Sequence, residues 1–502
     1  MSETRLPASL RGFRIHLVGA KGTGMAALAE ILAAGGASLS GSDVADHFYT
    51  DEILAGIGVA MAEGFDPGHL GEGVDLVIHS AAYAPDRNPE LLEAARRGIP
   101  VLVYPEALGE LSRRFDSSGI AGVHGKTTTT ALAGSLVSAL GLPATVLAGS
   151  AVSSFGGRST KILGDRFFVA ETCEYRRHFL HFSPRRIVLT SVEPDHQDYY
   201  PAYGDILAAF VEYGRLLPPG GELIYCADDP GAVEAAGAIA SGRPDIVLVP
   251  YGEKAQGRYR LLSYVTGEGR AVFRLAGLPG DFELRVPGRH LALDAAAALA
   301  LAISLLGAER AGPAASPAGS SAGYEPSPEE LAALRGALAS FSGSKRRSEI
   351  LGEAGGVLFM DDYGHHPTAL RETIRGIKAF WPGRRLVVDF MSHTYSRTKA
   401  LFGDFVESLD GADSLVLHKI YASAREEPDP ALSGRSLYEA ARARRLASGA
   451  GPTAYYEEPL DALEPLAASL RPGDLFLTMG AGDNWKLGLA LLERRKAAEG
   501  KR

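Results

Sequence analysis

The sequence predicts an α/β protein with three α/β domains in series, the first of them built around a parallel sheet of Rossmann type. Two observations predict this class. Apolar runs alternate with helical runs along nearly the whole chain, which is typical of parallel sheets covered by helices. The 502 residues also exceed one ordinary core, since a domain usually takes ~100–200 residues.

The first domain is predicted over residues 1–116. An apolar strand at 13–19 leads into a glycine-rich turn and the helical run 25–36, and a short strand-like run ends at residue 43. A strand at 74–82, a helix at 88–98 and a strand at 99–104 follow. This alternation favours a parallel sheet of Rossmann type.

The second domain is predicted over residues 117–342. It begins with a strand, a glycine-containing turn and a helix at 127–141, and further strands are expected at 166–171 and 186–193. The apolar run 291–308 contains Asp294 and is interpreted as a buried helix. The segment 311–328 is rich in Pro, Gly, Ser and Ala, so a flexible surface insertion is predicted there, before a helix at 329–340.

The third domain is predicted over residues 343–502. Strands are expected at 357–363, 385–391, 413–421 and 474–481, separated by helical runs. The same alternation again indicates an α/β fold.

Composition excludes several classes of partner. A net charge of -9 gives no basic surface for nucleic acid and no polybasic patch for a membrane. The two cysteines, Cys173 and Cys226, provide no disulfide framework, and the first residues lack the apolar stretch of a signal peptide. The sequence therefore predicts a cytoplasmic protein.

A phosphate-binding loop is predicted at residues 122–130. Glycines let backbone N–H groups approach an anion, a lysine reaches the outer phosphates and the next hydroxyl holds magnesium. Gly122, Gly125, Lys126 and Thr127 meet these needs in a shortened G-x-x-G-K-T pattern. The alternative is a glycine-rich turn capped by threonines. The order of strand, loop, lysine and helix favours ATP binding.

Polar residues also follow two later strands. Glu171 ends one apolar run, and Asp195 and His196 follow another. Ligands gather at the carboxyl ends of parallel strands, and magnesium prefers oxygen ligands. These residues are candidates for a metal site near the last phosphate, although single residues at strand ends are usually solvated or act as caps.

The residues resemble the Mur ligase family over nearly the whole chain. The motifs are HLVGAKGTGMAALAEIL, GSDV, HSAAY with NPE, GVHGKTTTT, VEPDHQDYY, VPGRH, KRRSE, DDYGHHPTAL, HTYSRT and MGAGDNW. The resemblance implies an N-terminal Rossmann-like domain, a central α/β domain of the P-loop ATPase type and a C-terminal Rossmann-like domain. It also implies an ATP-dependent carboxylate–amine ligase with Mg2+, and it is strongest to the branch that adds L-alanine to UDP-N-acetylmuramate in peptidoglycan precursor synthesis. Such ligases form an acyl phosphate, which the amine then attacks. A monomer or homodimer is expected.

The resemblance also implies roles for individual residues. Lys126, Glu171, His196 and Arg346 are the expected catalytic residues, and Thr127, Glu171 and His196 the expected metal ligands. The nucleotide is expected to contact Gly122, His124, Gly125, Lys126, Thr127, Thr128, Asp294 and Arg347. The other substrates are expected to contact Gly22, Gly24, Met25, Ser42, Asp43, Ser80, His366, His393, Tyr395 and Arg397. Arg397 is the choice for the amino-acid carboxylate, because a guanidinium matches a carboxylate.

The sequence departs from the family's pattern at four places. Val123 replaces a threonine of the loop, and Leu291 with Asp294 stand where two asparagines associated with adenine are usual. Thr394 replaces a basic residue, and Tyr104 with Pro105 replaces Arg-Ala. No lysine lies between Lys161 and Lys254, so the carbamylated lysine of several sister ligases is absent, which favours the alanine branch.

Three alternatives remain open on the sequence alone. A recycling ligase would attach a preformed peptide to the same sugar. The missing asparagines are compatible with a catalytically reduced protein that binds a nucleotide or a UDP-sugar. His365 and His366 beside Asp361 and Asp362 could suggest zinc, but no further ligands at regular spacing support it.

Overall fold

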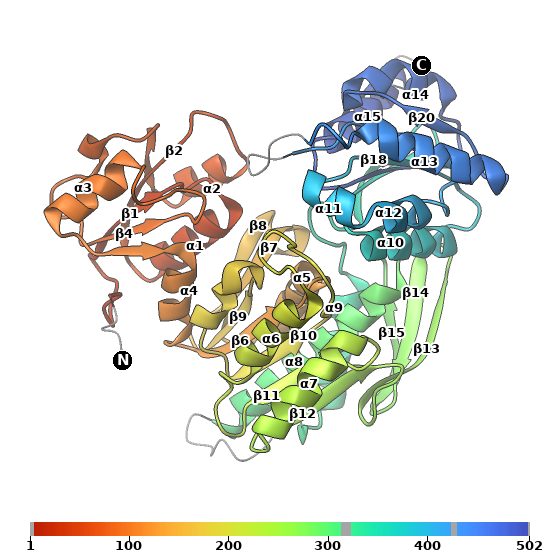
Figure 1. Ribbon diagram of the computed structural model, residues 1–502. Coiled ribbons are helices and arrows are strands. Elements are labelled where there is room, and N and C mark those ends of the chain that lie inside the picture. The colour runs from red at the N-terminus through yellow and green to blue at the C-terminus, as the bar shows by residue number, and fades with distance from the viewer. Residues whose placement is uncertain (1–4, 313–322, 423–428, 500–502) are drawn as a thin grey trace. The chain divides into compact units, whose positions relative to one another are not determined.

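The chain forms two compact units in the computed structural model, which describes residues 5–312, 323–422 and 429–499 (Figure 1). The first unit comprises Met1–Glu193, Gly204–Arg260 and Ala295–Ala337. The second comprises Pro194–Tyr203, Leu261–Asp294 and Leu338–Arg502. The two boundaries expected between the three domains stay predictions, because the first unit includes both the N-terminal sheet and most of the central sheet.

The N-terminal sheet is wholly parallel, with the strand order β3-β2-β1-β4-β5. Its strands are β1 (Arg14–Val18), β2 (Ser38–Asp43), β3 (Ala60–Glu63), β4 (Leu76–His79) and β5 (Val101–Val103). Its helices are α1 (Thr23–Ala34), α2 (Thr50–Gly56), α3 (Pro89–Arg97) and α4 (Tyr104–Ser112). The parallel sheet expected from the sequence is confirmed.

Helix α3 shows how local sequence sets the bounds of an element. The Asn88 side chain accepts hydrogen bonds from the backbone N–H groups of Glu90 and Leu91, and Pro89 occupies the first helical position. Gly98 ends the helix in a left-handed conformation with φ +69°. The cap delivers Glu90 into the interior of the domain, where it is fully buried.

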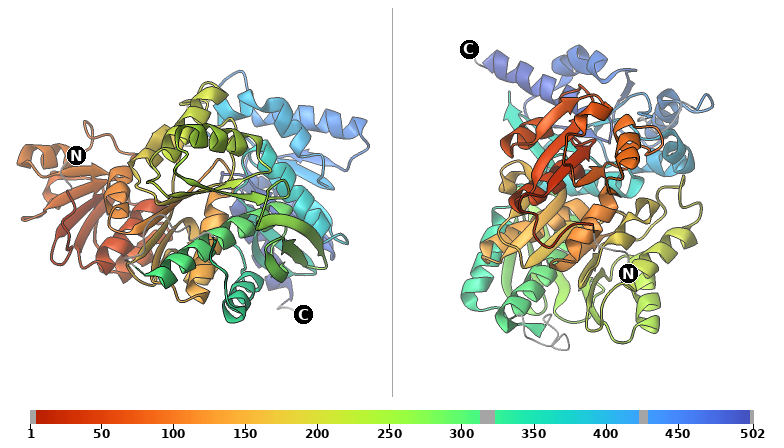
Figure 2. Two further views of the ribbon diagram at one scale, coloured as in Figure 1. Left: turned by 90° about the horizontal axis from the view of Figure 1, so that it is seen from below. Right: turned by 90° about the vertical axis from the view of Figure 1, so that its left-hand side faces the viewer.

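The central sheet follows the order β12-β11-β10-β6-β9-β7-β8, parallel except for the β7–β8 pair. Its strands are β6 (Asp116–Ala121), β7 (Ala144–Val152), β8 (Arg158–Ile162), β9 (Phe167–Glu171), β10 (Arg186–Leu189), β11 (Glu222–Cys226) and β12 (Val247–Gly252). The helices are α5 (Lys126–Ala139), α6 (Tyr203–Gly214) and α7 (Pro230–Gly242). Figure 2 shows helices on both faces of this sheet.

Helix α8 (Arg289–Ala311) is long and apolar enough to cross a membrane, but 89% of its apolar window is buried inside the protein. It therefore has the character of a core helix, as the sequence predicts. Most of the expected insertion, residues 313–322, lies outside the described residues. At the end of that segment, Tyr324 donates to Glu330, and α9 (Pro328–Ala339) begins at residue 328.

A run of three antiparallel strands that was not predicted from the sequence continues the central sheet beyond β12, to which the start of β13 (Tyr259–Gly267) pairs in parallel. The other two strands are β14 (Arg270–Leu275) and β15 (Leu278–Leu284). The residue patterns there are broken by glycines and charges, with Gly267 and Gly269 flanking the first turn at positive φ. Antiparallel strands with several exposed residues and interrupted apolar patterns give a weaker signal than buried parallel strands.

The C-terminal sheet has the order β16-β17-β21-β18-β19-β20, with only the β16–β17 pair antiparallel. Its strands are β16 (Glu349–Ala354), β17 (Val357–Asp362), β18 (Arg385–Phe390), β19 (Ser414–Leu417), β20 (Thr453–Tyr455) and β21 (Asp474–Met479). The helices are α10 (Pro367–Phe380), α11 (Tyr395–Ala400), α12 (Phe402–Ser408), α13 (Gly434–Ala447), α14 (Leu463–Ser469) and α15 (Trp485–Glu499). The four strands expected here are confirmed.

Candidate active site

The predicted phosphate loop joins β6 to α5. Gly122 adopts φ +136° and Gly125 φ +79°, conformations that side chains other than glycine rarely tolerate. A Cβ added at Gly122 would lie 2.1 Å from the Thr190 Oγ1 atom. The loop therefore passes close to β10, and the first N–H groups of α5 are left without partners inside the helix. Such a helix start is an anion-binding feature.

Lys126 is the first residue of α5, and its ammonium group lies 2.9 Å and 3.1 Å from the two carboxylate oxygens of Glu174. It also donates to the carbonyl oxygen of Gly122, which holds it against the loop. Burial alone would lower the pKa of Lys126, but Glu174 outweighs burial and the pKa is raised. The lysine is therefore a fixed positive charge. Glu174 was missed by the sequence analysis.

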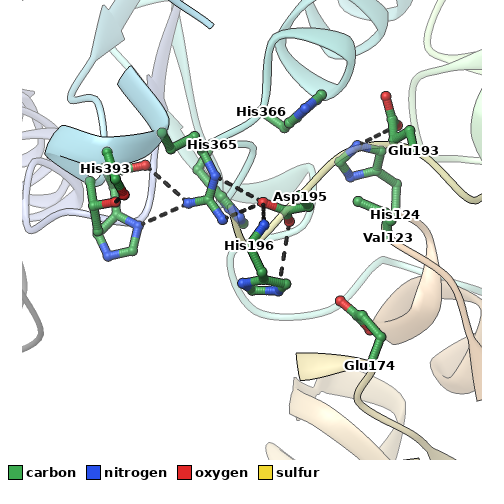
Figure 3. Close-up of polar contacts among 12 residues, drawn as sticks. Val123, His124, Glu174, Glu193, Asp195, His196, His365, His366 and His393 are labelled. Carbon is green, nitrogen blue, oxygen red and sulfur yellow. Dashed lines mark hydrogen bonds and ion pairs between the residues drawn. The ribbon is translucent and has the colours of Figure 1, made fainter. Parts of the chain in front are cut away.

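His124 is held by the strand next to the loop. Its backbone N–H donates to the Ser191 hydroxyl at 2.9 Å, and its Nε2 atom lies 2.7 Å from a Glu193 carboxylate oxygen (Figure 3). Glu193 follows β10, so the pair joins the loop to the end of a neighbouring strand. Glu193 was not among the site residues predicted from the sequence, although Glu193 lies in the same motif as Asp195 and His196.

Two expected oxygen ligands lie in the first unit, Glu171 at the end of β9 and Thr127 in the first turn of α5. Glu171 is the last residue of β9, which pairs with β6 through the Ile120–Glu171 register position. Its carboxylate accepts a hydrogen bond of 2.9 Å from the backbone N–H of Gly149. Thr127 and Thr128 are buried in the first turn of α5. Hydroxyl and carboxylate oxygens are ligands that magnesium accepts, so this donor set fits a magnesium ion.

The glycine-rich turn after β1 holds the expected sugar-nucleotide residues. Gly22 is exposed and precedes α1, Gly24 lies in the first turn of α1, and Met25 is buried. Ser80 follows β4 and is partly exposed. The turn and the end of β4 thus lie at the same, carboxyl edge of the sheet, where ligands of open α/β sheets bind.

Ser42 and Asp43 support this turn from β2. The Ser42 hydroxyl is fully buried and donates to Glu90 at 2.5 Å. Asp43 accepts hydrogen bonds from the Lys21 backbone N–H at 2.7 Å and from the Tyr83 hydroxyl at 3.0 Å. Both side chains are hydrogen-bonded to other residues of the chain, so they fix the position of the turn. Their expected contact with the uridine part of the UDP-sugar remains a prediction.

The second unit contains a buried ion pair that joins residues far apart in sequence. The Arg397 guanidinium donates to one oxygen of Asp195 at 2.8 Å and 3.2 Å, and to the His393 carbonyl oxygen at 3.0 Å (Figure 3). Burial alone would raise the pKa of Asp195, but Arg397 and His196 hold it far below its usual range. Asp195 is therefore charged, and it holds the guanidinium that the sequence analysis assigns to the amino-acid carboxylate.

The histidines and the tyrosine around this pair are placed by neighbouring elements. His366 caps α10, where its Nδ1 atom accepts from the Thr368 N–H at 3.3 Å. His393 stacks on Tyr421, and Tyr395 begins α11. Burial, followed by the charge of Arg397, holds the pKa of His365 well below its usual value, so that imidazole is neutral. The expected roles of His366, His393 and Tyr395 stay predictions.

Arg346 and Arg347 flank Tyr363, with guanidinium carbons 5.0 Å and 5.1 Å from the ring centroid. Arg346 also donates to Asp361 at 2.8 Å and to the Gly480 carbonyl oxygen at 2.7 Å. Within the second unit, Arg346 is thus already held by a carboxylate. Its expected contact with ATP remains a prediction.

The contacts of Asp361 and Asp362 argue against a zinc site formed by these carboxylates with His365 and His366. Asp361 binds Arg346 and the Thr478 hydroxyl, and Asp362 accepts from the backbone N–H groups of Ser348 and Gly364. Both carboxylates therefore already have partners within the protein.

His196, an expected metal ligand, belongs to the second unit, within Pro194–Tyr203, and has φ +53°. Asp294 is buried near the start of α8.

The phosphate loop at the start of α5, with carboxylate and hydroxyl oxygens near it in the first unit, has the features of a site for a nucleotide phosphate and a magnesium ion. Three family models match the chain in order: the Mur ligase catalytic domain at residues 14–116, the Mur ligase middle domain at 120–302 and the Mur ligase glutamate ligase domain at 346–482. The chain belongs to the Mur ligase family.

Curated relatives cover the whole chain. A UDP-N-acetylmuramate–L-alanine ligase of Treponema pallidum is 52% identical over 491 residues, which is 98% of each chain. A protein of the same name from Borreliella burgdorferi is 38% identical over 476 residues, covering 94% of this chain and 97% of the relative.

Solved structures share the fold. A UDP-N-acetylmuramate-alanine ligase from Thermotoga maritima matches with a TM-score of 0.74 at 24% identity, covering 97% of this chain and 99% of that chain. A murein peptide ligase from Psychrobacter arcticus matches with a TM-score of 0.63 at 22% identity, covering 96% and 98%. The predicted α/β architecture is confirmed.

Proposed function

We propose that this protein is an ATP-dependent ligase that joins L-alanine to UDP-N-acetylmuramate in peptidoglycan precursor synthesis. The observation that carries the proposal is the 52% identity, over 98% of both chains, to a relative named for this reaction. The phosphate loop and the fixed charge of Lys126 supply the physical support. Curated relatives of this name favour alanine over a preformed peptide, and the intact loop disfavours a catalytically reduced protein.

The chemistry requires two displacements. An oxygen of the sugar's lactyl carboxylate attacks the γ-phosphorus of ATP, and ADP leaves, which gives an acyl phosphate. The nitrogen of alanine, having lost a proton, then attacks the acyl carbon, and inorganic phosphate leaves as the amide forms. A free carboxylate is a poor acyl donor, so phosphorylation supplies the leaving group. The protein contributes positioning and charge neutralisation.

Residues of the first unit are proposed to hold ATP. Backbone N–H groups from Gly122 to Thr128 surround the phosphates, and Lys126 neutralises the charge that develops between the β- and γ-phosphates. His124 lies in the same loop. Mg2+, when bound through Thr127, Glu171 and His196, supplies further charge neutralisation at the phosphates. Asp294 in α8 is proposed to lie at the adenine, in place of the family's asparagines.

The remaining substrates are assigned to the two Rossmann-like domains. The turn with Gly22, Gly24, Met25 and Ser80 is proposed to bind the UDP-sugar, supported by Ser42 and Asp43. Alanine is proposed to contact His366, His393, Tyr395 and Arg397. The phosphates of ATP are proposed to contact Arg346 and Arg347. We propose domain boundaries at 116/117 and 342/343, a cytoplasmic location, a monomer or homodimer, and no nucleic acid or membrane partner.

Phosphate release tests this function. The purified chain is incubated with UDP-N-acetylmuramate, ATP and magnesium, and with alanine, serine, glycine or a stem tripeptide in turn. We expect the highest kcat/KM with L-alanine. A higher kcat/KM with the tripeptide would establish the recycling reaction instead, and no release above background with any amine would remove the ligase assignment.

A further inference from the structure

A cavity of about 140 Å3 lies within the first unit. Gly24 of α1 and Tyr104 of α4 form one side of it, and Glu171 of β9 forms another. Its walls are mostly apolar and include Leu108, Leu147, Phe179 and Phe182. His178 also lines it, from the segment η3 (Tyr175–His181). Among the described residues that line it, none is a lysine or an arginine.

The position of this cavity relates it to one part of the proposed sugar substrate. Gly24 belongs to the turn proposed to bind the UDP-sugar, where we place its diphosphate, and Glu171 to the proposed magnesium site at the reacting phosphate. In an N-acetylmuramoyl sugar, the acetamido group sits on the ring carbon between the one that bears the diphosphate and the one that bears the lactyl ether. A substrate that spans these two places therefore carries its acetamido group between them.

The chemistry of the walls suits that group better than a carboxylate. Because no lysine or arginine stands among the described residues of the cavity wall, a carboxylate there would have no cation to pair with, which is unfavourable in a partly dry site. An acetamido group is neutral, has a methyl group for apolar walls, and needs only a hydrogen-bond partner for its carbonyl oxygen. His178 is an imidazole suited to that task.

The segment that leads into His178 is anchored by two ion pairs and has an unusual backbone conformation. Glu174 binds Lys126 before the turn, and Arg177 donates to Glu212 of α6 at 2.6 Å. Arg176 and Arg177 both adopt left-handed backbone conformations, with φ +51° and +59°, which residues other than glycine rarely adopt. Backbone strain of this kind clusters at functional sites.

The ionisation of His178 agrees with a neutral ligand. Burial lowers its pKa, and the nearby positive groups His181 and Arg176 lower it further. At neutral pH the ring therefore carries one N–H donor and one acceptor nitrogen. The Tyr175 ring lies edge-on to the imidazole, with centroids 6.4 Å apart.

We propose that His178 is a substrate-binding residue that selects the N-acetyl group of the sugar. Its imidazole N–H donates to the acetamido carbonyl oxygen, and the methyl group packs against Phe179 and Phe182. This inference rests on the proposed function and extends it to one group of one substrate.

Steady-state kinetics with two sugar substrates tests the inference. The wild type and His178→Ala are compared on UDP-N-acetylmuramate and on the same UDP-sugar with a free 2-amino group. We expect His178→Ala to lower kcat/KM for the acetylated sugar about 10-fold, since a neutral hydrogen bond in a desolvated site is lost. The KM values for ATP and alanine should stay within about 2-fold. Discrimination against the deacetylated sugar should fall by a similar factor.

Two variants separate this role from a structural one. His178→Gln keeps an N–H donor and should recover part of the lost kcat/KM, whereas His181→Ala changes an exposed histidine of the same segment and should behave as wild type. If His178→Ala leaves discrimination between the two sugars unchanged, or if Gln behaves as Ala does, the assignment of His178 is wrong. The proposed ligase function survives that result as long as the wild type releases phosphate with alanine.

Discussion

Lys126 and Arg397 are both cations held by a buried carboxylate, but their surroundings differ. Lys126 lies in a loop shaped by two left-handed glycines, and its partner Glu174 is 48 residues away. Arg397 lies in α11, and its partner Asp195 is 202 residues away in a segment grouped with the second unit. The first pair is set by local loop geometry, and the second depends on a long-range packing arrangement.

Removing the lysine should give the largest effect. Lys126→Ala is expected to lower kcat at least about 100-fold, because it removes a preorganised charge at the phosphates. It should also destabilise the first unit by about 3 kcal/mol, since the buried Glu174 carboxylate loses its partner. Phosphate release and urea unfolding measure the two effects.

The double variant Lys126→Ala/Glu174→Gln separates these effects. It should recover most of the lost stability and none of the activity, whereas the exposed Lys254→Ala serves as a neutral control. Near-normal turnover in Lys126→Ala would remove Lys126 from the reaction.

Substitution of Arg397 should change the affinity for alanine more than it changes kcat. Arg397→Ala is expected to raise KM for alanine about 10-fold or more with little change in KM for ATP, because a charge-assisted contact to the carboxylate is lost. Asp195→Asn keeps the guanidinium but removes its counter-charge, so unfolding should become easier by about 2–3 kcal/mol.

Kinetics against each substrate and urea unfolding check both variants. If Arg397→Ala raised KM for ATP and alanine equally, Arg397 would be a structural residue of the second unit and its substrate role would be lost.

The smallest effect is expected from pH, and it should be confined to the second unit. His418 is fully buried, with Nε2 2.6 Å from an Asp389 oxygen and Nδ1 3.0 Å from the Tyr456 carbonyl oxygen. Both nitrogens face acceptors, so both are protonated. Burial alone would lower the pKa of His418, but Asp389 outweighs it and the pKa is raised.

A raised pKa fixes the direction of the pH effect. The stability that protonated His418 contributes is fully present below the unfolded value of about 6.5 and is lost as pH rises through the folded pKa. Urea midpoints should therefore fall at alkaline pH, and His418→Gln should flatten this slope while the exposed His47→Gln leaves it intact. An unchanged slope in His418→Gln would assign the titration to another group.

The sequence predicted the features that are local. Alternating strands and helices, and the spacing of Gly122, Gly125 and Lys126, act within a few residues of one another, and the parallel sheets are confirmed. Residues that come into contact only in the folded protein could not be predicted from these local patterns. Glu174, Glu193 and the Asp195–Arg397 pair come from different strand ends or distant segments, and nothing in their local sequence marks their partner. The antiparallel strands β13–β15 were missed because their apolar pattern is short and interrupted.

The central claim is that the sugar carboxylate is activated by phosphoryl transfer before the amide forms. UDP-N-acetylmuramate labelled with a heavy oxygen isotope in its lactyl carboxylate is incubated with ATP and L-alanine, and the released phosphate is examined by mass spectrometry or phosphorus NMR. The account predicts one labelled oxygen in each phosphate released and an alanyl amide in the product. Unlabelled phosphate from the same reaction would contradict it.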